Sequence, residues 1–377
     1  MQFIDLGAQR ARIEDKINSA IAHVVASGQY ILGPKVTEFE ERLAEYLGVK
    51  HVVACANGTD ALKMPLMAKN IGLGDAVFCP SFTFSATAEV VALVGAEPVF
   101  VDVLPDTFNI DVEKLCEAIE MIKQEGRLKP KAIIAVDLFG LPADYAKIAH
   151  VAAKENLFVI EDAAQSMGGR SGNTMCGAFG DVAATSFYPA KPLGCYGDGG
   201  AMMTNDDHLA ELLRSILFHG KGETQYDNVR IGMNSRLDTI QAAILLEKLV
   251  IFEEEMEKRV KIAQYYSNHL RDVVAVPEVG ENVRCAYAQY TLKVKDRDKL
   301  KDYLQKNSIP TMIYYKTPLH QQPAYEHFPY VKGSLSVSRS LGDHVLSLPM
   351  HPYLTQNEQD MIIEKIRDFY LQSYEWV

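Results

Sequence analysis

The stretch TSFYPAK at 185–191 runs directly into the turn-rich PLGCYGDGG at 192–200, and this junction decides the fold. The first part is apolar and β-rich and ends at Lys191, whereas Gly and Pro in the second part interrupt regular structure. An earlier apolar strand, LFVIEDAAQS at 157–166, ends at Asp162. Alone, a lysine after a strand is usually solvated, and an aspartate there often caps a helix. Together, the two residues indicate a ligand site.

Lys191 and Asp162 have the chemistry that pyridoxal 5′-phosphate (PLP) requires of a protein. A lysine amine can condense with the aldehyde of PLP. A carboxylate that faces the pyridine nitrogen keeps the ring protonated, so that the ring draws electrons from the substrate carbon. The pair therefore predicts a PLP site.

Composition and charge limit the classes of protein to which the chain can belong. At 377 residues the chain is long enough for about two domains, and 48% hydrophobic and 23% charged residues are typical of a globular protein. The 38 Lys and Arg against 49 Asp and Glu give a net charge of −11, without a basic run that could bind nucleic acid. An anionic ligand therefore needs local cations or backbone N–H groups.

The cysteines and the N-terminal residues predict the cellular compartment. The six cysteines are scattered, without a CxxC pair or the His spacing of a zinc site, so we expect reduced thiols and no metal. The N-terminal MQFIDLGAQRARIEDK lacks the apolar core of a signal peptide, and no apolar run of about eighteen residues follows. We expect a soluble cytoplasmic protein with no membrane segment.

Between about residues 34 and 205, short apolar runs alternate with amphipathic helical stretches, as in an α/β sheet with crossover helices. Several runs are apolar on both faces and are expected to be central strands. The strands expected in a mostly parallel, seven-stranded sheet are 51–57, 75–80, 97–103, 131–140, 157–164, 181–190 and 199–205.

A long helical pattern begins near Ser235 and runs to 270, far beyond the length of a crossover helix, so we expect it to bridge two domains. We place a large α/β domain at 1–245 and a smaller C-terminal α+β domain at 246–377. The smaller domain is expected to hold strands at 286–294 and 310–315 and helices at 296–307 and 355–371, with Trp376 in a loose tail.

The segment CANGTDAL at 55–62 places Gly58 and Thr59 between a strand and a helix start. Free N–H groups and the helix dipole there can hold a phosphate, and Thr59 adds a hydroxyl. The alternative is a capped helix after a turn, and GxxxxGK, the P-loop pattern, is absent.

SFTFSATAEVV at 81–91 offers Phe84, whose ring could lie flat on a pyridine, although an aromatic there is more often part of the core. Gln165 shares a strand end with Asp162, and Ser186 precedes Lys191. One bound cofactor would satisfy all these polar residues.

The chain contains five characteristic segments, which are GTDAL, FTFSATA, EDAAQS, SFYPAKPLGCYGDGG and NSRLDTIQAA. In the order and spacing of these segments, the chain resembles the DegT/DnrJ/EryC1/StrS sugar aminotransferases. The likeness covers residues 3–370, nearly the whole chain. It implies the PLP-dependent transferase fold of type I, that of aspartate aminotransferase.

The resemblance implies a role for each matching residue. Lys191 bonds covalently to PLP and performs the proton transfers, and Asp162 pairs with the pyridine nitrogen. Gln165 approaches the phenolic oxygen, and Phe84 stacks on the ring. The phosphate is held by Gly58, Thr59 and Ser186.

Asn234 is implied to reach in from the neighbouring subunit of a homodimer, which predicts shared active sites. The alternative is an N-cap of the long helix, a role that Ser235 or Asp238 could equally serve.

Within this group, GQYILGP, SRLDTIQAAILLEKLVIFEEE and LSLPMHPYL resemble enzymes that aminate the 3-keto form of a UDP-linked N-acetyl-hexuronic acid in surface polysaccharide synthesis. The substrate-binding residues implied are Arg230, Tyr314, Tyr315 and His320. The group ordinarily has a His-Tyr pair where this chain has Tyr314 and Tyr315, and Arg230 could also be a surface arginine.

The reaction implied is a transamination from glutamate to a UDP-linked ketosugar, and a UDP-4-keto-sugar 4-aminotransferase is the alternative. Lys191 argues against a related sugar dehydratase, which has histidine there. A PLP-binding regulatory protein stays open. The missing GxGxxG argues against a nicotinamide dehydrogenase.

Overall fold

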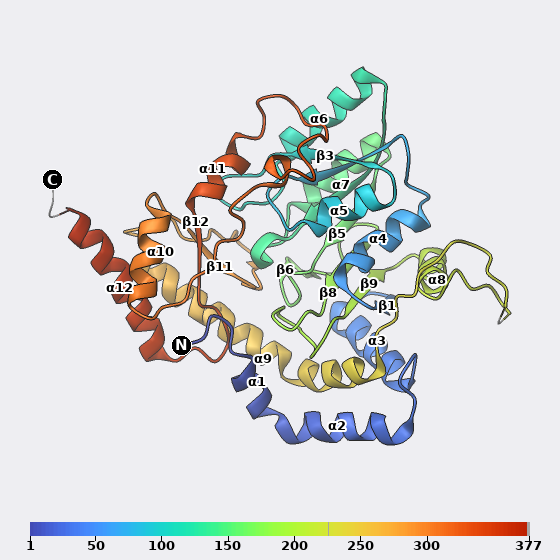
Figure 1. Cartoon of the computed structure of the whole chain (residues 1–377), viewed down its shortest axis with the longest axis horizontal. Coiled ribbons are helices and arrows are strands. Elements are labelled where there is room, and N and C mark those ends of the chain that lie inside the picture. Colours follow the sequence, from blue (N-terminus) through green and yellow to red (C-terminus); the bar gives the residue numbers. More distant parts are fainter. Residues whose placement is uncertain (225, 375–377) are drawn as a thin grey trace.

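A computed structural model describes residues 1–224 and 226–374, so Trp376 lies outside the described residues. Its centre is a seven-stranded sheet in the order β1-β9-β8-β5-β4-β2-β3 (Figure 1). Only β9 runs against its neighbours, β1 and β8; the other pairs are parallel. The strands, all seven of them predicted, are β1 (His51–Cys55), β2 (Asp75–Pro80), β3 (Glu97–Val101), β4 (Lys129–Val136), β5 (Phe158–Asp162), β8 (Val182–Ser186) and β9 (Gly200–Thr204).

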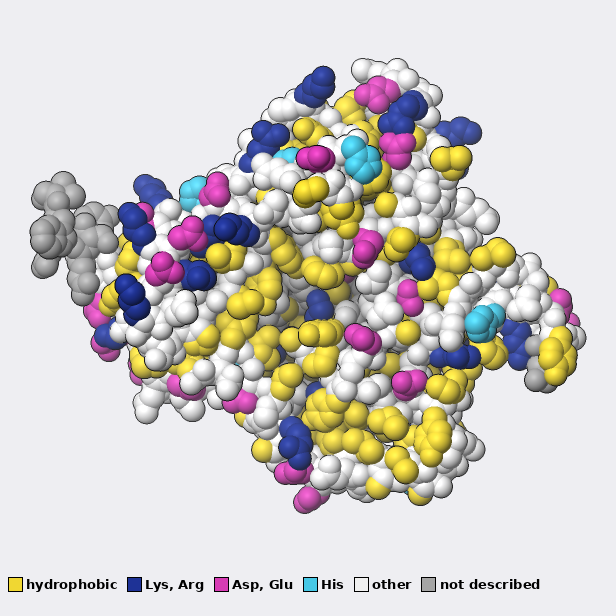
Figure 2. Space-filling model, in the orientation of Figure 1, with side chains coloured by type: hydrophobic (Ala, Val, Ile, Leu, Met, Phe, Trp, Pro, Cys, Tyr) yellow, Lys and Arg dark blue, Asp and Glu magenta, His cyan; other side chains and the backbone are white. Residues whose placement is uncertain are grey.

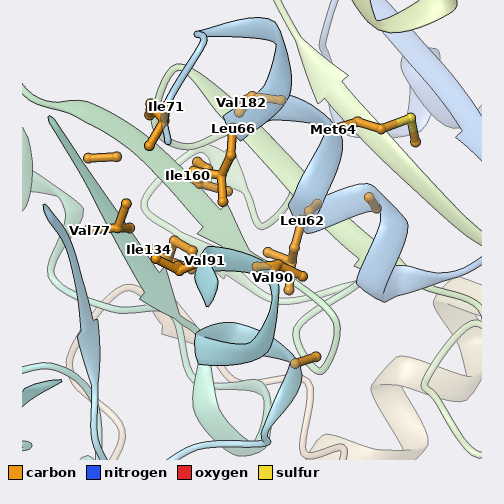
Figure 3. Packing of buried hydrophobic residues seen from close by; sticks show 14 of the residues in the cluster. Leu62, Met64, Leu66, Ile71, Val77, Val90, Val91, Ile134, Ile160 and Val182 are labelled. Atoms are coloured by element: carbon orange, nitrogen blue, oxygen red, sulfur yellow. The ribbon is translucent and has the colours of Figure 1, made fainter. Parts of the chain in front are cut away.

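The strands are almost continuously apolar because both faces of the sheet are covered. Successive side chains point to opposite faces, so Val159 and Ile160 of β5 belong to different cores. In the core of Figure 3, Ile134, Ile160 and Val182 of the strands meet apolar side chains of α4 (Gly58–Ala68) and α5 (Ala86–Leu93).

The other helices complete the layers around the sheet. The core of Figure 3 also includes residues of α8 (Asp207–Ile216). On the opposite face, the cores contain α3 (Pro34–Leu47), α6 (Val112–Glu125), α7 (Tyr145–Glu155) and the first part of α9 (Thr239–Leu270). At the N-terminus, α1 (Leu6–Arg12) contacts α2 (Glu14–Ser27), which packs on α9.

The long helix α9 spans 32 residues and begins at Thr239, after the N-cap residue Asp238. The N-cap alternative for Asn234 is therefore wrong. Apolar residues of α9 up to Met256 join a core of the large sheet, whereas those from Ile262 onwards join the core of the C-terminal part. The helix thus passes through two cores, and the division at 245/246 remains a prediction.

The C-terminal part is built on the antiparallel pair β11 (Tyr290–Lys293) and β12 (Val345–Leu348). The helices predicted there are α10 (Arg297–Lys306) and α12 (Gln356–Tyr374), and α11 (Ser336–His344) precedes β12. The strand predicted at 310–315 is wrong: Met312 forms one isolated bridge to Ser347. Ser347 belongs to β12, so Met312 lies at the edge of β12 that faces away from β11.

The remaining described elements are short. They are the strands β6 (Arg170–Ser171), β7 (Thr174–Met175) and β10 (Val283–Arg284), and the 3₁₀ turns η1 (Leu138–Gly140) and η2 (Leu319–Gln321). Within 1–224 and 226–374, no helix combines the length and hydropathy that a membrane crossing needs.

Candidate active site

The sequence-predicted residues gather where the parallel strands end. In the sheet register, Asp162 of β5 pairs with Ala184 of β8, and Ser186 at the end of β8 pairs with Gly200 of β9. Gly200 in turn pairs with Cys55, the last residue of β1, and α4 follows directly. Ligands of open α/β sheets bind at this carboxyl edge.

Asp162 is a buried carboxylate whose negative charge is only partly balanced by its hydrogen-bond donors. Its side chain is 6% exposed, and its two oxygens accept hydrogen bonds from Thr87 Oγ1 and from the backbone N–H of Ala164, both at 3.2 Å. Burial raises the pKa of Asp162 to about 6, while the charge of Lys191 acts in the opposite direction. A cation beside Asp162 therefore favours its ionised form.

Lys191 lies in the turn after β8, where its backbone N–H donates to the carbonyl of Tyr188 at 2.8 Å. Burial lowers the pKa of the Lys191 amine, and the charge of Asp162 partly counters this. The tertiary structure thus brings Lys191 and Asp162 close enough for their charges to influence each other. A lysine with a lowered pKa is suited to exchanging protons near neutral pH.

The predicted phosphate end is formed by a close approach of α4 to β8. A Cβ atom added to Gly58 would lie 2.6 Å from the Cβ of Ser186, so only glycine allows this distance. Asn57 caps α4 by accepting from the N–H of Asp60 at 2.8 Å. The earlier N–H groups, those of Gly58 and Thr59, belong to the helix start that can bind an anion.

Phe84, Tyr315 and Gln165 form one side of the site. The ring of Phe84 is 55% exposed, with its centroid 6.3 Å from that of Tyr315. Nε2 of Gln165 donates to the Tyr315 hydroxyl at 3.2 Å, and Oε1 accepts from the backbone N–H of Phe139 at 2.6 Å. Phe84 is therefore no core residue; it presents its ring as a ligand platform would.

Two other predicted substrate residues lie on segments next to this side. Tyr314 is partly buried, with its ring 6.4 Å from that of Phe3 near the N-terminus. His320 is only 5% exposed: its Nδ1 lies 2.6 Å from Ser81 Oγ, and its Nε2 accepts from Arg339 Nε at 3.1 Å. Both ring nitrogens of His320 already have partners, so one of these contacts must break before His320 can bind a substrate directly. Its role in substrate binding remains a prediction.

Arg230 and Asn234 lie on the segment that extends outwards beyond α8 (Figure 1). Asn234 is exposed and bridges to Phe218, and Arg230 donates to the hydroxyl of Ser215. None of the hydrogen bonds found among the described residues joins Arg230 or Asn234 to the Lys191 turn. Their roles, with Asn234 acting from a neighbouring subunit, remain predictions.

Sequence reasoning missed a buried pair of acids beneath the site. Asp137 follows β4, Glu161 precedes Asp162, and ligand atoms of both lie within 4.8 Å of each other and of Cys176 Sγ. Burial raises the pKa of both carboxyl groups, and the neighbouring Asp137 raises that of Glu161 further. The sign of this acid pair in the sequence was the acidic dipeptide Glu161-Asp162 at the end of β5.

This acid pair already has donors from the chain. Asp137 accepts hydrogen bonds from Ser166, Tyr145 and the N–H of Ala143, and each oxygen of Glu161 accepts a backbone N–H. These bonds fasten the turn that carries Asp162 and Gln165. The cluster therefore has a structural explanation that needs no metal ion.

The residues fit PLP, as three observations on the chain indicate. A buried carboxylate lies in the field of a partly buried lysine, a half-exposed aromatic ring flanks them, and a Cβ at Gly58 would fill the helix start opposite Ser186. With the sheet topology, they define an aminotransferase of fold type I, a class that uses PLP.

The chain belongs to the DegT/DnrJ/EryC1/StrS aminotransferase family, whose profile matches residues 11–367. A UDP-2-acetamido-2-deoxy-3-oxo-D-glucuronate aminotransferase of Pseudomonas aeruginosa is 49% identical over 94% of this chain and 96% of that protein. A crystal structure of a family member from Brucella abortus is 66% identical, with a TM-score of 0.97 over 98% of this chain and 99% of that one.

A relative with its cofactor bound supports the assignment of PLP. NtdA from Bacillus subtilis, solved with bound PMP, is 30% identical, with a TM-score of 0.87 over 97% of this chain and 82% of that chain. PMP is the aminated form of PLP. The cofactor predicted from Lys191 and Asp162 is thereby confirmed, whereas the role of each residue remains a prediction.

Gly58→Ala is expected to weaken PLP binding by about tenfold, because overpacking of this kind costs about 1–3 kcal/mol. The added Cβ would push α4 away from Ser186. Titration of the apoprotein with PLP, followed by absorbance, measures the effect. Gly280→Ala is the matched control, since its Cβ would meet Val283 at an ordinary 3.8 Å. Unchanged affinity in the Gly58 variant would remove this helix start from the site.

Proposed function

We propose that this protein is a sugar-nucleotide aminotransferase that moves an amino group from glutamate to the 3-keto position of a UDP-linked N-acetyl-hexuronic acid. The observation that carries this proposal is the position of Lys191 and Asp162 at the carboxyl edge of the sheet, close enough for the charge of each to shift the pKa of the other. The Pseudomonas aeruginosa relative, named for a UDP-linked 3-oxo-glucuronate, supports this choice of sugar.

PLP supplies an electron-withdrawing ring that stabilises negative charge on the substrate carbon. The chain's own residues then have separate tasks. Ionised Asp162 keeps the ring positively charged, and the amine of Lys191 moves protons at the carbon that gains or loses nitrogen. Thr87 and Ala164 hold the carboxylate of Asp162 in place through their hydrogen bonds.

The substrate is strongly anionic, whereas the chain carries a net charge of −11. Local cations must therefore bind the diphosphate or the sugar carboxylate. We assign this task to Arg230, supplied with Asn234 by a second copy in a homodimer with shared sites. Tyr314, Tyr315 and His320 complete the proposed sugar-binding side.

Exposed apolar side chains support the proposed homodimer. Val25, Tyr30, Ile31 and Leu32 are between 47% and 51% exposed. Figure 2 shows hydrophobic side chains gathered around the position that α2 has in Figure 1. Contiguous apolar surface of this kind is typical of protein interfaces.

Synthesis of bacterial surface polysaccharide is the proposed context, because such polymers contain amino sugars made as nucleotide derivatives. A cytoplasmic location belongs to the same proposal. The six cysteines are all free thiols, which agrees with a reducing compartment.

The test supplies glutamate and either a UDP-3-keto-uronate or a UDP-4-keto-sugar to the PLP-loaded protein and measures 2-oxoglutarate. We expect 2-oxoglutarate with the 3-keto substrate. Turnover with only the 4-keto sugar would select the alternative aminotransferase. If neither sugar is aminated when glutamate or another amino donor is supplied, despite bound PLP, the protein would be a regulatory protein.

A further inference from the structure

The turn that carries Lys191 is fastened to helix α9 by two side chains. Nζ of Lys248 donates to the carbonyl oxygen of Gly194 at 2.6 Å. Oε1 of Gln241, two helical turns earlier, accepts from the backbone N–H of Tyr196 at 2.9 Å. Both bonds reach backbone atoms, so they hold the path of the turn rather than one side chain.

The turn itself is compact. A Cβ atom on Gly194 would lie 2.6 Å from the carbonyl oxygen of Pro189 and 2.7 Å from that of Tyr188. The N–H of Cys195 donates to the carbonyl of Phe187 at 2.8 Å, so the chain folds back on the end of β8. Because Gly194 packs this closely against Tyr188 and Pro189, a shift of Gly194 would also move the backbone around Lys191.

Lys248 is buried to an extent that lysines seldom reach. Its side chain is only 1% exposed, and its Nζ lies 4.2 Å from the centroid of the Tyr196 ring. Burying an ammonium group is costly unless it has partners, and the carbonyl and the ring face supply them. A methionine or leucine would fill this space without that cost, so the amine and its bond to Gly194 point to a specific task.

We propose that Lys248 is a positioning residue, which fixes the turn 188–197 so that the amine of Lys191 is held beside Asp162. This inference rests on the proposed function of Lys191 but adds a residue from outside the site. Since α9 continues into the C-terminal core at Ile262, the same helix ties the Lys191 turn to the part that carries Tyr314 and Tyr315.

The test compares Lys248→Met with Lys261→Met, which removes an exposed lysine from the same helix. We expect Lys248→Met to lower kcat by about tenfold or more with little change in the KM of the ketosugar, because binding groups stay while the Lys191 amine loses its position. Lys261→Met should behave as the wild type.

Two measurements on the apoprotein need no sugar substrate. Hydrogen exchange in a peptide covering 188–197 should become about tenfold faster in Lys248→Met, since a lost buried hydrogen bond changes the opening equilibrium by about that factor. The rate at which added PLP becomes borohydride-fixed to Lys191 should fall as well. Both measurements remain informative if the proposed sugar is wrong.

Wild-type exchange and a wild-type rate of PLP capture in Lys248→Met would overturn the proposal. If that variant does not fold, Lys248→Gln takes its place, because its polar side chain is one bond shorter and falls short of the Gly194 carbonyl that Nζ of Lys248 reaches. The expected and contradicting results for Lys248→Gln are the same. A drop in kcat without any change in the 188–197 peptide would also refute a positioning role.

Discussion

Lys191→Ala is expected to give a folded protein that binds PLP without a covalent bond and turns over at least about 10⁴-fold more slowly than the wild type. Lys191 is partly buried, and its amine lies in the electrostatic field of the Asp162 carboxylate. Its loss removes both the attachment point and the proton-transfer group. Steady-state assays of 2-oxoglutarate formation, together with circular dichroism, measure the loss and confirm folding.

Borohydride reduction followed by peptide mass spectrometry provides the second readout for Lys191. The wild type should gain the mass of PLP on the peptide that contains Lys191, and the variant should gain none. Lys154→Ala, which removes an exposed lysine of α7, is the control and should retain both activity and labelling. A Lys191→Ala enzyme with near-normal rates would refute the assignment of the catalytic lysine.

Asp162→Ala is expected to lower kcat by about 10²–10³-fold, the range that removal of one preorganised electrostatic partner produces. Without the Asp162 carboxylate, the predicted site has no negative side chain to balance the positive charge of a protonated pyridine ring. Asp302→Ala, at an exposed site on α10, is the control. Equal activity of the two variants would mean that another group supports the cofactor ring.

The pH dependence of the apoprotein gives Asp162 an independent test. Burial raises the pKa of this acid to about 6, so its contribution to folding stability is present at low pH and is lost as the pH rises through about 6. Asp162→Asn cannot ionise and should lack this loss. Urea unfolding of both apoproteins between pH 4 and 8 measures the difference; parallel curves would contradict the raised pKa.

Local sequence patterns were sufficient to predict the strands of the large sheet, and they singled out Lys191 and Asp162 at its carboxyl edge. Each of the seven strands was evident because a strand buried on both faces must be apolar at successive positions, as in β5 and β8. Lys191 and Asp162 were evident because each breaks such a run at its end. The cofactor followed from their chemistry and is confirmed by relatives.

Lys248 shows where pattern reading stops. It lies three residues after Leu245 and four before Phe252, both of them buried, so helical spacing places it on the apolar face of α9. A lysine within a long helix nevertheless gives no sign of which carbonyl it will meet. That partner, Gly194, is 54 positions away and is set by the packing of α9 on the turn.

The sequence by itself determined the seven strands of the large sheet, the helices between them and the cofactor, since these depend on neighbouring residues and on residue type. The tertiary structure alone decided that Asp238 rather than Asn234 is the N-cap residue of α9, that 310–315 forms one bridge to β12 instead of a strand, and that Glu161 meets Asp137. These features depend on contacts between distant segments. Their energies come from burial and from long-range hydrogen bonds, which no stretch of consecutive residues encodes.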